Sequence, residues 1–161
     1  MSHDAPQETD PGDDFRAQLF VRIGAVTVAG GHVEFAMRRL LSVLTGGTAF
    51  SPMAEIPVHW DALEKRLQSA SSTDPQDGQG LRLGEVLDWA KRKKIKERRN
   101  HVIHGAWWND PNSSPGLSRF QRGEQPVSIF FSFEALESVA ERLWEYARRL
   151  NDLVEQGTTG P

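Results

Sequence analysis

The strongest constraint on this chain is a stripe of apolar residues that recurs every three or four positions across residues 14–44. Its members are Leu19, Ile23, Val26, Gly30, Val33, Met37, Leu40 and Leu44. Such spacing predicts a single long amphipathic helix, which Gly46 and Gly47 would end. Because Gly30 lies on the stripe, a second helix that crosses there would make a close backbone contact. Gly30 and Gly31 also destabilise a helix, which leaves open a break into two shorter ones.

Three further segments show helical spacing. A short helix is predicted over residues 60–70, and another over residues 81–104, which Gly105 would stop. Between them, residues 70–80 are rich in turn-forming side chains and indicate a loop. Ser132 is the expected cap of the last helix. The apolar face of that helix consists of Leu136, Val139, Leu143, Ala147, Leu150 and Val154.

Residues 105–131 differ in character from the helical segments on either side. Three short runs, GAWW, LSRFQR and VSIFF, alternate with the turn-forming stretches NDPNSSPG and GEQP. This alternation predicts a short antiparallel hairpin or meander. We therefore expect a mainly α protein, a helical bundle of about four to five helices with a short β-hairpin insertion before the last helix.

The length of 161 residues suits one domain and is too short for two comfortable ones. Residues 1–13 are acidic, contain two prolines and have almost no large apolar groups, so they predict a disordered N-terminal tail. Residues 14–155 then form the single helical domain. Residues 156–161 are expected to be a flexible C-terminal tail.

Composition excludes several classes of protein. The net charge of −3 excludes an overall basic surface that coats nucleic acid, so any attraction for phosphate must be local. The absence of cysteine excludes disulfides and cysteine-based metal sites. No segment approaches about 18 consecutive apolar residues, so no membrane-spanning helix is expected. The N-terminus also lacks the features of a secretory signal, and we expect a cytoplasmic protein.

The most informative stretch is the basic run at residues 91–99 together with the motif that follows it. The run contains seven basic residues and one acidic residue, with Ile95 as its apolar anchor. Phosphate neutralisation is the simplest reason for such a run in a protein that is acidic elsewhere. Arg99, Asn100 and His104 add a flat phosphate-binding fork, an amide and an imidazole suited to proton transfer. On a helix, Asn100 and His104 share one face.

The two ionisable side chains of this motif do not share a helix face, because Arg99 lies about 140° around the axis from His104. They would converge if the helix unwinds at Gly105, or if two copies of the motif meet across a dimer. Glu34, in the first helix, is a candidate ion-pair partner for an arginine of the motif; an ordinary surface carboxylate is the alternative.

The two tryptophans that follow the motif and the other histidines are explained mostly by packing or by surface exposure. Trp107 and Trp108 would face opposite ways on a strand, so one is expected to pack inward and the other to be exposed unless it covers a neighbour or stacks on a base. His101 is expected at the surface or supporting the site, and His32 and His59 are expected to be structural. No metal-ligand spacing and no phosphate-binding glycine loop occurs, so neither a metal nor a cofactor is predicted.

Arg99-Asn100-x-x-x-His104, at the end of a helix in a mostly helical chain of this size, resembles the HEPN superfamily, which is defined by an Arg-x4–6-His motif. The resemblance implies a helical bundle that dimerises and brings two motifs into one cleft. It also implies a metal-independent endoribonuclease in which the 2′-hydroxyl of the RNA attacks the phosphate. His104 would be the general acid–base, Arg99 would bind the scissile phosphate, and Asn100 would orient His104 or the phosphate.

The same resemblance extends to partners. Four side chains are expected to contact the RNA strand: Lys93, Lys96, Arg98 and Trp108. Arg98 also has an allowed spacing from the histidine, so it competes with Arg99 for the phosphate-binding role. Similar enzymes serve as toxins or phage-defence nucleases, so we expect RNA, a second copy of the chain and an antitoxin or regulatory protein as partners, and no membrane.

Two other functions remain open at this point. The superfamily includes members that have lost catalysis, so a non-catalytic helical module that binds a protein, a nucleotide or RNA is the alternative. A structural or regulatory subunit without a nucleic-acid role is the third. Substitution of His104 discriminates a nuclease from a docking surface, because salt-sensitive RNA binding is common to both.

Overall fold

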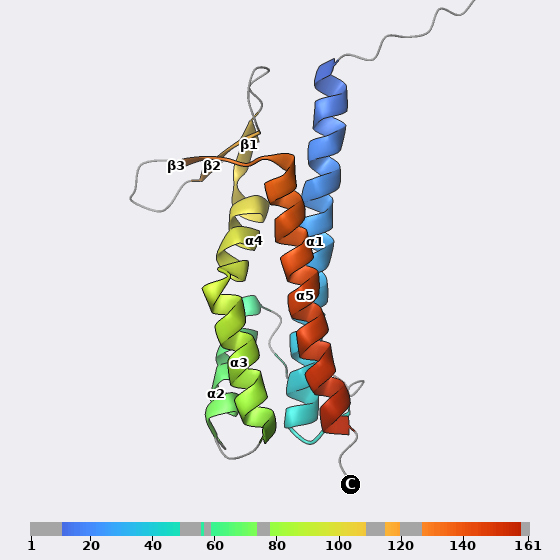
Figure 1. Ribbon diagram of the computed structural model, residues 1–161, viewed down its shortest axis with the longest axis vertical. Coiled ribbons are helices and arrows are strands. Elements are labelled where there is room, and N and C mark those ends of the chain that lie inside the picture. Colours follow the sequence, from blue (N-terminus) through green and yellow to red (C-terminus); the bar gives the residue numbers. More distant parts are fainter. Residues whose placement is uncertain are drawn as a thin grey trace, which may run out of the picture.

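The computed structural model describes residues 11–48, 56, 59–73, 78–108, 115–119 and 127–158. Within these residues the chain forms five helices and one small antiparallel sheet, and the sheet lies before the last helix. Figure 1 shows α1 and α5 side by side along the length of the molecule, with α3 and α4 next to them. The predicted fold class, a helical bundle with a small β insertion, is confirmed.

The core lies mainly between the two long helices, α1 (Pro11–Leu44) and α5 (Phe133–Thr158). α1 is continuous through Gly30 and Gly31, so the single long helix is confirmed and the alternative of a break is wrong. All six residues of the predicted apolar face of α5 are buried. The predicted cap is also present, because the Oγ of Ser132 accepts a hydrogen bond of 3.1 Å from the amide of Ala135.

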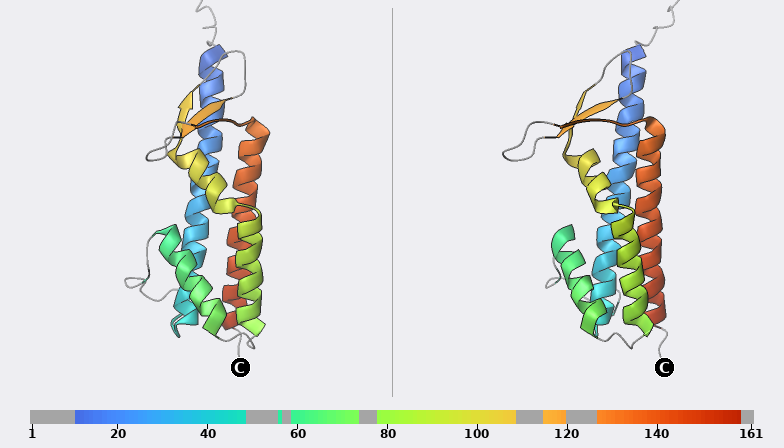
Figure 2. Two further views of the ribbon diagram at one scale, coloured as in Figure 1. Left: turned by 90° about the vertical axis from the view of Figure 1, so that its left-hand side faces the viewer. Right: turned by 60° about the vertical axis from the view of Figure 1, so that its left-hand side comes forward.

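The helix predicted over residues 81–104 is instead two helices, α3 (Gly78–Arg92) and α4 (Ile95–His104). Lys94 separates them and adopts a left-handed backbone conformation with φ of 52°. Figure 2 shows the change of direction between α3 and α4. The basic run at residues 91–99 is therefore divided between the end of one helix, a turn and the start of the next, and it does not form a single helix face.

The physical reason for this break is the position of Lys94. In an unbroken helix Lys94 would continue the buried stripe of α3, which consists of Leu83, Leu87 and Ala90. Burial of its ammonium group without a partner would be costly. The break leaves Lys94 exposed and brings Ile95 into the core in its place.

Several helices extend a few residues further than the sequence indicates. α1 begins at Pro11, inside the expected tail 1–13, and α5 ends at Thr158, inside the expected tail 156–161. α2 (Trp60–Thr73) and α3 occupy both ends of the expected loop 70–80. Serine hydroxyls in the last turns of α2 donate to helix carbonyls, so these polar side chains are satisfied within the helix. Residues 1–10, 74–77, 109–114, 120–126 and 159–161, where the rest of both tails and the predicted turns fall, lie outside the described residues.

The predicted meander is confirmed as a sheet with strand order β1-β2-β3. Trp107 points inward, and its indole N–H donates a 2.9 Å hydrogen bond to the carbonyl of Val102 in α4. Trp108 faces outward with 37% of its surface exposed, as alternation on a strand requires. The sheet is thus anchored on the end of α4 that carries His104. Its strands are β1 (Ala106–Trp108), β2 (Gly116–Arg119) and β3 (Val127–Phe130).

Gly105 forms the tight junction between α4 and β1, and we predict that Gly105→Ala destabilises the protein. A Cβ at this position would overlap the buried side chain of Leu117 and lie 2.8 Å from the carbonyl oxygen of His101. Relief requires the sheet to shift away from α4, at a cost of about 1–3 kcal/mol. Thermal unfolding should show a Tm lower by about 2–4 °C for each kcal/mol.

Gly84→Ala in α3 is the matched control for this substitution. A Cβ there has nothing within 4 Å, so the helix-favouring alanine should raise the Tm slightly. An unchanged Tm for Gly105→Ala would contradict the proposed tight junction.

Candidate functional site

The guanidinium of Arg99 is held between α4 and α1. Its Nη2 lies 3.3 Å from Oε1 of Glu34 on α1, and its Nη1 donates to Oδ1 of Asn100 at 3.1 Å. The expected pairing of Glu34 with an arginine of the motif is therefore confirmed. The guanidinium carbon also lies 5.7 Å from the ring centroid of Trp60, and 17% of the side chain is exposed. Arg99 is thus fixed in orientation and only partly accessible.

Gly30 explains how α4 approaches α1 at this point. A Cβ on Gly30 would lie 3.2 Å from Nε of Arg99, so the absence of a side chain makes room for the arginine stem. A second helix was expected to cross at Gly30, and α4 does so, but the expected close backbone contact is wrong, because the atoms nearest to Gly30 belong to the Arg99 side chain. What occupies the space is an arginine side chain, whose buried Nε has no hydrogen-bond partner among the described residues.

His104 is the last residue of α4, and its side chain is exposed. Asn100, one turn earlier on the same face, is half-buried and contacts Arg99. Within one protomer the structure therefore joins Arg99 with Asn100 and leaves His104 exposed at the end of the helix. Of the other histidines, the ring of His32 packs 4.4 Å from that of Trp144, and His59 supplies a backbone carbonyl to the first turn of α2.

The four residues expected to contact RNA differ in their surroundings. Lys93 and Arg98 are exposed, and neither makes a described ion pair or hydrogen bond through its side chain. Trp108 is partly exposed, packs edge-on against Phe130 and donates from its indole N–H to the hydroxyl of Ser118 at 3.1 Å. These three side chains remain available to a ligand at the surface.

Lys96 is engaged within the protein. It forms ion pairs with Asp61 and Glu64, both on α2, the second at 3.3 Å. The hydrogen bond to Asp61 is the main cause that raises the pKa of Lys96, with Glu64 adding to it and partial burial opposing it. Its charge is already paired, so Lys96 joins α4 to α2 and is the least available of the predicted RNA contacts.

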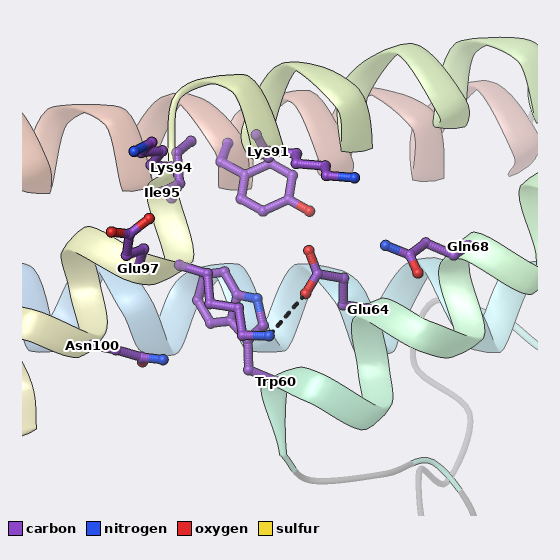
Figure 3. Close-up of a pocket in the computed structure, with 11 residues that line it drawn as sticks. Trp60, Glu64, Gln68, Lys91, Lys94, Ile95, Glu97 and Asn100 are labelled. Carbon is purple, nitrogen blue, oxygen red and sulfur yellow. Dashed lines mark hydrogen bonds and ion pairs between the residues drawn. The ribbon is translucent and has the colours of Figure 1, made fainter. Parts of the chain in front are cut away.

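A cavity of about 470 Å³ lies directly beside Asn100, between α2, α3, α4 and α5. Figure 3 shows Glu64 directed into it from α2, with Gln68 at one end and Asn100 at the other, while Lys91 comes from the α3 side. Arg99 and His104 do not line it. Arg99 is nevertheless linked to the cavity through two residues that do, Asn100 and Trp60.

Sequence reasoning did not single out Trp60, Glu64 or Tyr146 as site residues. The available signal was on α2, where Trp60, Glu64 and Gln68 recur every four residues and so share one helix face. Tyr146, on α5, lies on the apolar side of an amphipathic helix, where an aromatic ring is ordinarily part of the core. Its participation depends on three other helices meeting it, which no local pattern records.

The outer face of α1 is a second notable surface. None of the exposed residues between Ala17 and Phe35 is Asp, Glu, Lys or Arg. Large apolar side chains are exposed along it: Phe20 (68%), Val21 (70%), Val28 (57%) and Phe35 (50%). α1 is therefore apolar on both sides. By length and composition alone α1 could cross a membrane, but the core helix of a soluble protein can have the same length and composition.

The described residues contain no group of three or more His, Asp or Glu side chains placed to hold a metal ion. The fold and the site define a helical-bundle protein with a small β-meander, in which one helix carries an anchored guanidinium and ends, five residues later, on an exposed imidazole. No family model, curated protein or solved structure matches this chain.

Proposed function

We propose that this protein is a metal-independent endoribonuclease of the HEPN type, with a toxin or phage-defence role, which acts as a cytoplasmic homodimer. His104 is the general acid–base, Arg99 binds the scissile phosphate and Asn100 orients His104 or the phosphate. The 2′-hydroxyl of the RNA attacks phosphorus and loses its proton, while the 5′-oxygen leaves and gains one. The products carry a 2′,3′-cyclic phosphate and a 5′-hydroxyl.

The observation that carries this proposal is the end of α4. An exposed imidazole follows, by one helical turn, an amide that holds a guanidinium in place. Glu34 and Asn100 each take one Nη of Arg99, so further N–H donors of the fork remain for a phosphate oxygen. A preoriented guanidinium stabilises the charge of the pentacoordinate transition state without reorganisation. The exposed Arg98 is the alternative phosphate ligand.

A second copy of the chain is supported by the outer face of α1. Small residues recur every seven positions at Ala17, Gly24 and Gly31, and larger apolar ones recur every seven at Val21, Val28 and Phe35. A Cβ on either glycine has nothing within 4 Å, so both positions are open hollows. Side chains that project from one α1 fit the hollows of another, as heptad spacing in paired helices requires.

Such pairing has a consequence for the catalytic motif. Two antiparallel α1 helices related by a two-fold axis keep both copies of α4 on the same side of the pair. Gly30, where α4 crosses α1, lies two residues from Val28, close to the middle of the stripe. Because Gly30 lies about 160° around the helix axis from Val28, the two α4 helices flank the α1 pair at the same level, and the proposed cleft lies over the pair between them.

The experiment that tests this function is cleavage of single-stranded RNA by the purified protein in the presence of EDTA. We expect cleavage to persist without divalent metal and to leave 2′,3′-cyclic phosphate ends, since the nucleophile is the ribose hydroxyl and the acid–base is a side chain. Cleavage that requires a divalent metal, or that leaves 5′-phosphate ends, would contradict the mechanism.

One observation favours a second candidate function. Arg99 is largely buried and already paired with Glu34, as a guanidinium that only stabilises the fold would be. A non-catalytic module would use the exposed cations near Lys94 as a docking surface for RNA or an acidic partner. This candidate predicts salt-sensitive binding, no RNA cleavage and no effect of His104 substitution on binding.

A further inference from the structure

Two residues that line the cavity beside Asn100 carry a buried hydrogen-bond donor that has no partner among the described residues. These are the indole N–H of Trp60 and the hydroxyl of Tyr146, whose side chains are 6% and 1% exposed. Buried polar groups are normally satisfied, so each such group requires an explanation. Burial and the negative charge of Glu64 raise the pKa of the Tyr146 hydroxyl, which keeps it protonated and therefore a donor.

Glu64 supplies a hydrogen-bond acceptor to the same cavity from a largely buried side chain. Glu64 uses Oε2 for Lys96 at 3.3 Å, and its Oε1 has no described partner. The side chain is only 21% exposed, and Figure 3 shows its carboxylate directed into the cavity. An anionic acceptor in such surroundings forms stronger hydrogen bonds to N–H donors than a neutral oxygen does.

The remaining walls of the cavity are apolar enough to pack against a ring. Trp60, Ala90 and Ile95 supply apolar surface, and the volume of about 470 Å³ is within the range of small-molecule sites. A planar ring that accepts hydrogen bonds at one edge and donates N–H groups at the next uses the two donors, the carboxylate and the apolar walls together. Among nucleobases, guanine has this pattern, with acceptors at O6 and N7 and donors at N1 and N2.

We propose that this cavity binds a guanine base unstacked from the RNA strand, with Glu64 accepting from its N1–H and N2–H and Tyr146 or Trp60 donating to its O6. The proposal deepens the proposed function and rests on it, because it assigns a base preference to the same active site. The base in the cavity places the adjoining ribose-phosphate at Asn100, and Asn100 contacts Arg99. Lys91 and Lys94, both exposed at the opposite rim, meet the backbone on the other side.

The first test measures binding by calorimetry and is independent of cleavage. Guanosine 5′-monophosphate is expected to bind the wild-type protein about 10- to 100-fold more tightly than adenosine 5′-monophosphate, which lacks the N2 donor and the O6 acceptor. Equal affinity for the two nucleotides, or no binding of either at millimolar concentration, would overturn the proposal.

Two variants assign the contacts. Glu64→Gln should remove the preference for guanine, whereas Glu97→Gln, which changes an exposed carboxylate at the rim, should retain it. Tyr146→Phe should weaken guanosine monophosphate binding and yet raise the Tm of the free protein by about 2–4 °C, since an unpartnered buried hydroxyl is removed. Loss of preference with Glu97→Gln in place of Glu64→Gln would overturn the assignment of the acceptor.

The second test separates the base pocket from the nuclease. Mapped cleavage of a mixed-sequence RNA is expected at guanine positions, and guanosine monophosphate should inhibit it. Cleavage without regard to base would overturn the pocket and leave the nuclease standing. Selective guanosine monophosphate binding without any RNA cleavage would overturn the nuclease and support the pocket. Binding that does not compete with RNA would assign the site to a free guanine nucleotide and overturn the strand assignment.

Discussion

Replacement of His104 by alanine is expected to reduce RNA cleavage by about 100- to 10,000-fold, because the acid–base that transfers protons to and from the ribose and leaving oxygens is lost. His104 is exposed at the last residue of α4 and makes no described side-chain contact, so its removal leaves no cavity and no unpaired group. The Tm and the affinity for RNA should therefore remain close to those of the wild-type protein. Single-turnover cleavage rates with saturating enzyme isolate the chemical step.

His59→Ala is the matched control, since His59 is an exposed histidine at the start of α2. Its variant should cleave RNA at the wild-type rate. If His104→Ala cleaves as fast as the wild type, His104 is not the acid–base, and the result favours the non-catalytic module. If His59→Ala is inactive instead, the proposal assigns catalysis to the wrong histidine.

Val28→Asp is expected to convert the proposed dimer into monomers and to abolish cleavage with it. Val28 is 57% exposed in the protomer, so aspartate is tolerated there by the isolated fold. In a two-fold pair of α1 helices the substitution buries two unpaired carboxylates near the axis, at a cost of roughly 3–5 kcal/mol. The dimer dissociation constant should rise by about 100- to 4000-fold. Analytical ultracentrifugation measures this change directly.

Leu81→Asp provides the control for added charge. Leu81 is equally exposed, at 57%, but lies on α3 away from the heptad stripe, so its variant should remain a dimer and retain activity. A Val28→Asp protein that is still dimeric would show that copies associate through another face. Recovery of the wild-type chain only from membranes, as a monomer in detergent, would assign the apolar face of α1 to lipid instead.

Sequence alone was sufficient for the features whose physical cause is local. The faces of α1 and α5, the cap at Ser132 and the opposite orientations of Trp107 and Trp108 all follow from spacings of two to four residues. The crossing of a second helix at Gly30 was also predictable, because a glycine on an otherwise apolar stripe marks a close approach.

The break at Lys94 shows where this local reasoning fails. The helical spacing of residues 81–104 predicted one helix, and the basic run at residues 91–99 was expected to lie on it. The structure differs because burial, rather than helix propensity, decides: Lys94 falls on the stripe that must enter the core, and Ile95 replaces it there. The ion pairs of Lys96 could not be predicted from local spacing either, since its two carboxylate partners belong to α2.

The chain's own order of residues thus determined a helical bundle, its β insertion and an arginine, an amide and an imidazole at the end of one helix. Only the tertiary structure decided that Arg99 is held by Glu34, that His104 remains exposed, and that a cavity lined by two residues with unpartnered donors lies beside Asn100. The reason is physical. Helical periodicity relates residues three or four positions apart, whereas this cavity is lined by residues from four helices that are distant in sequence.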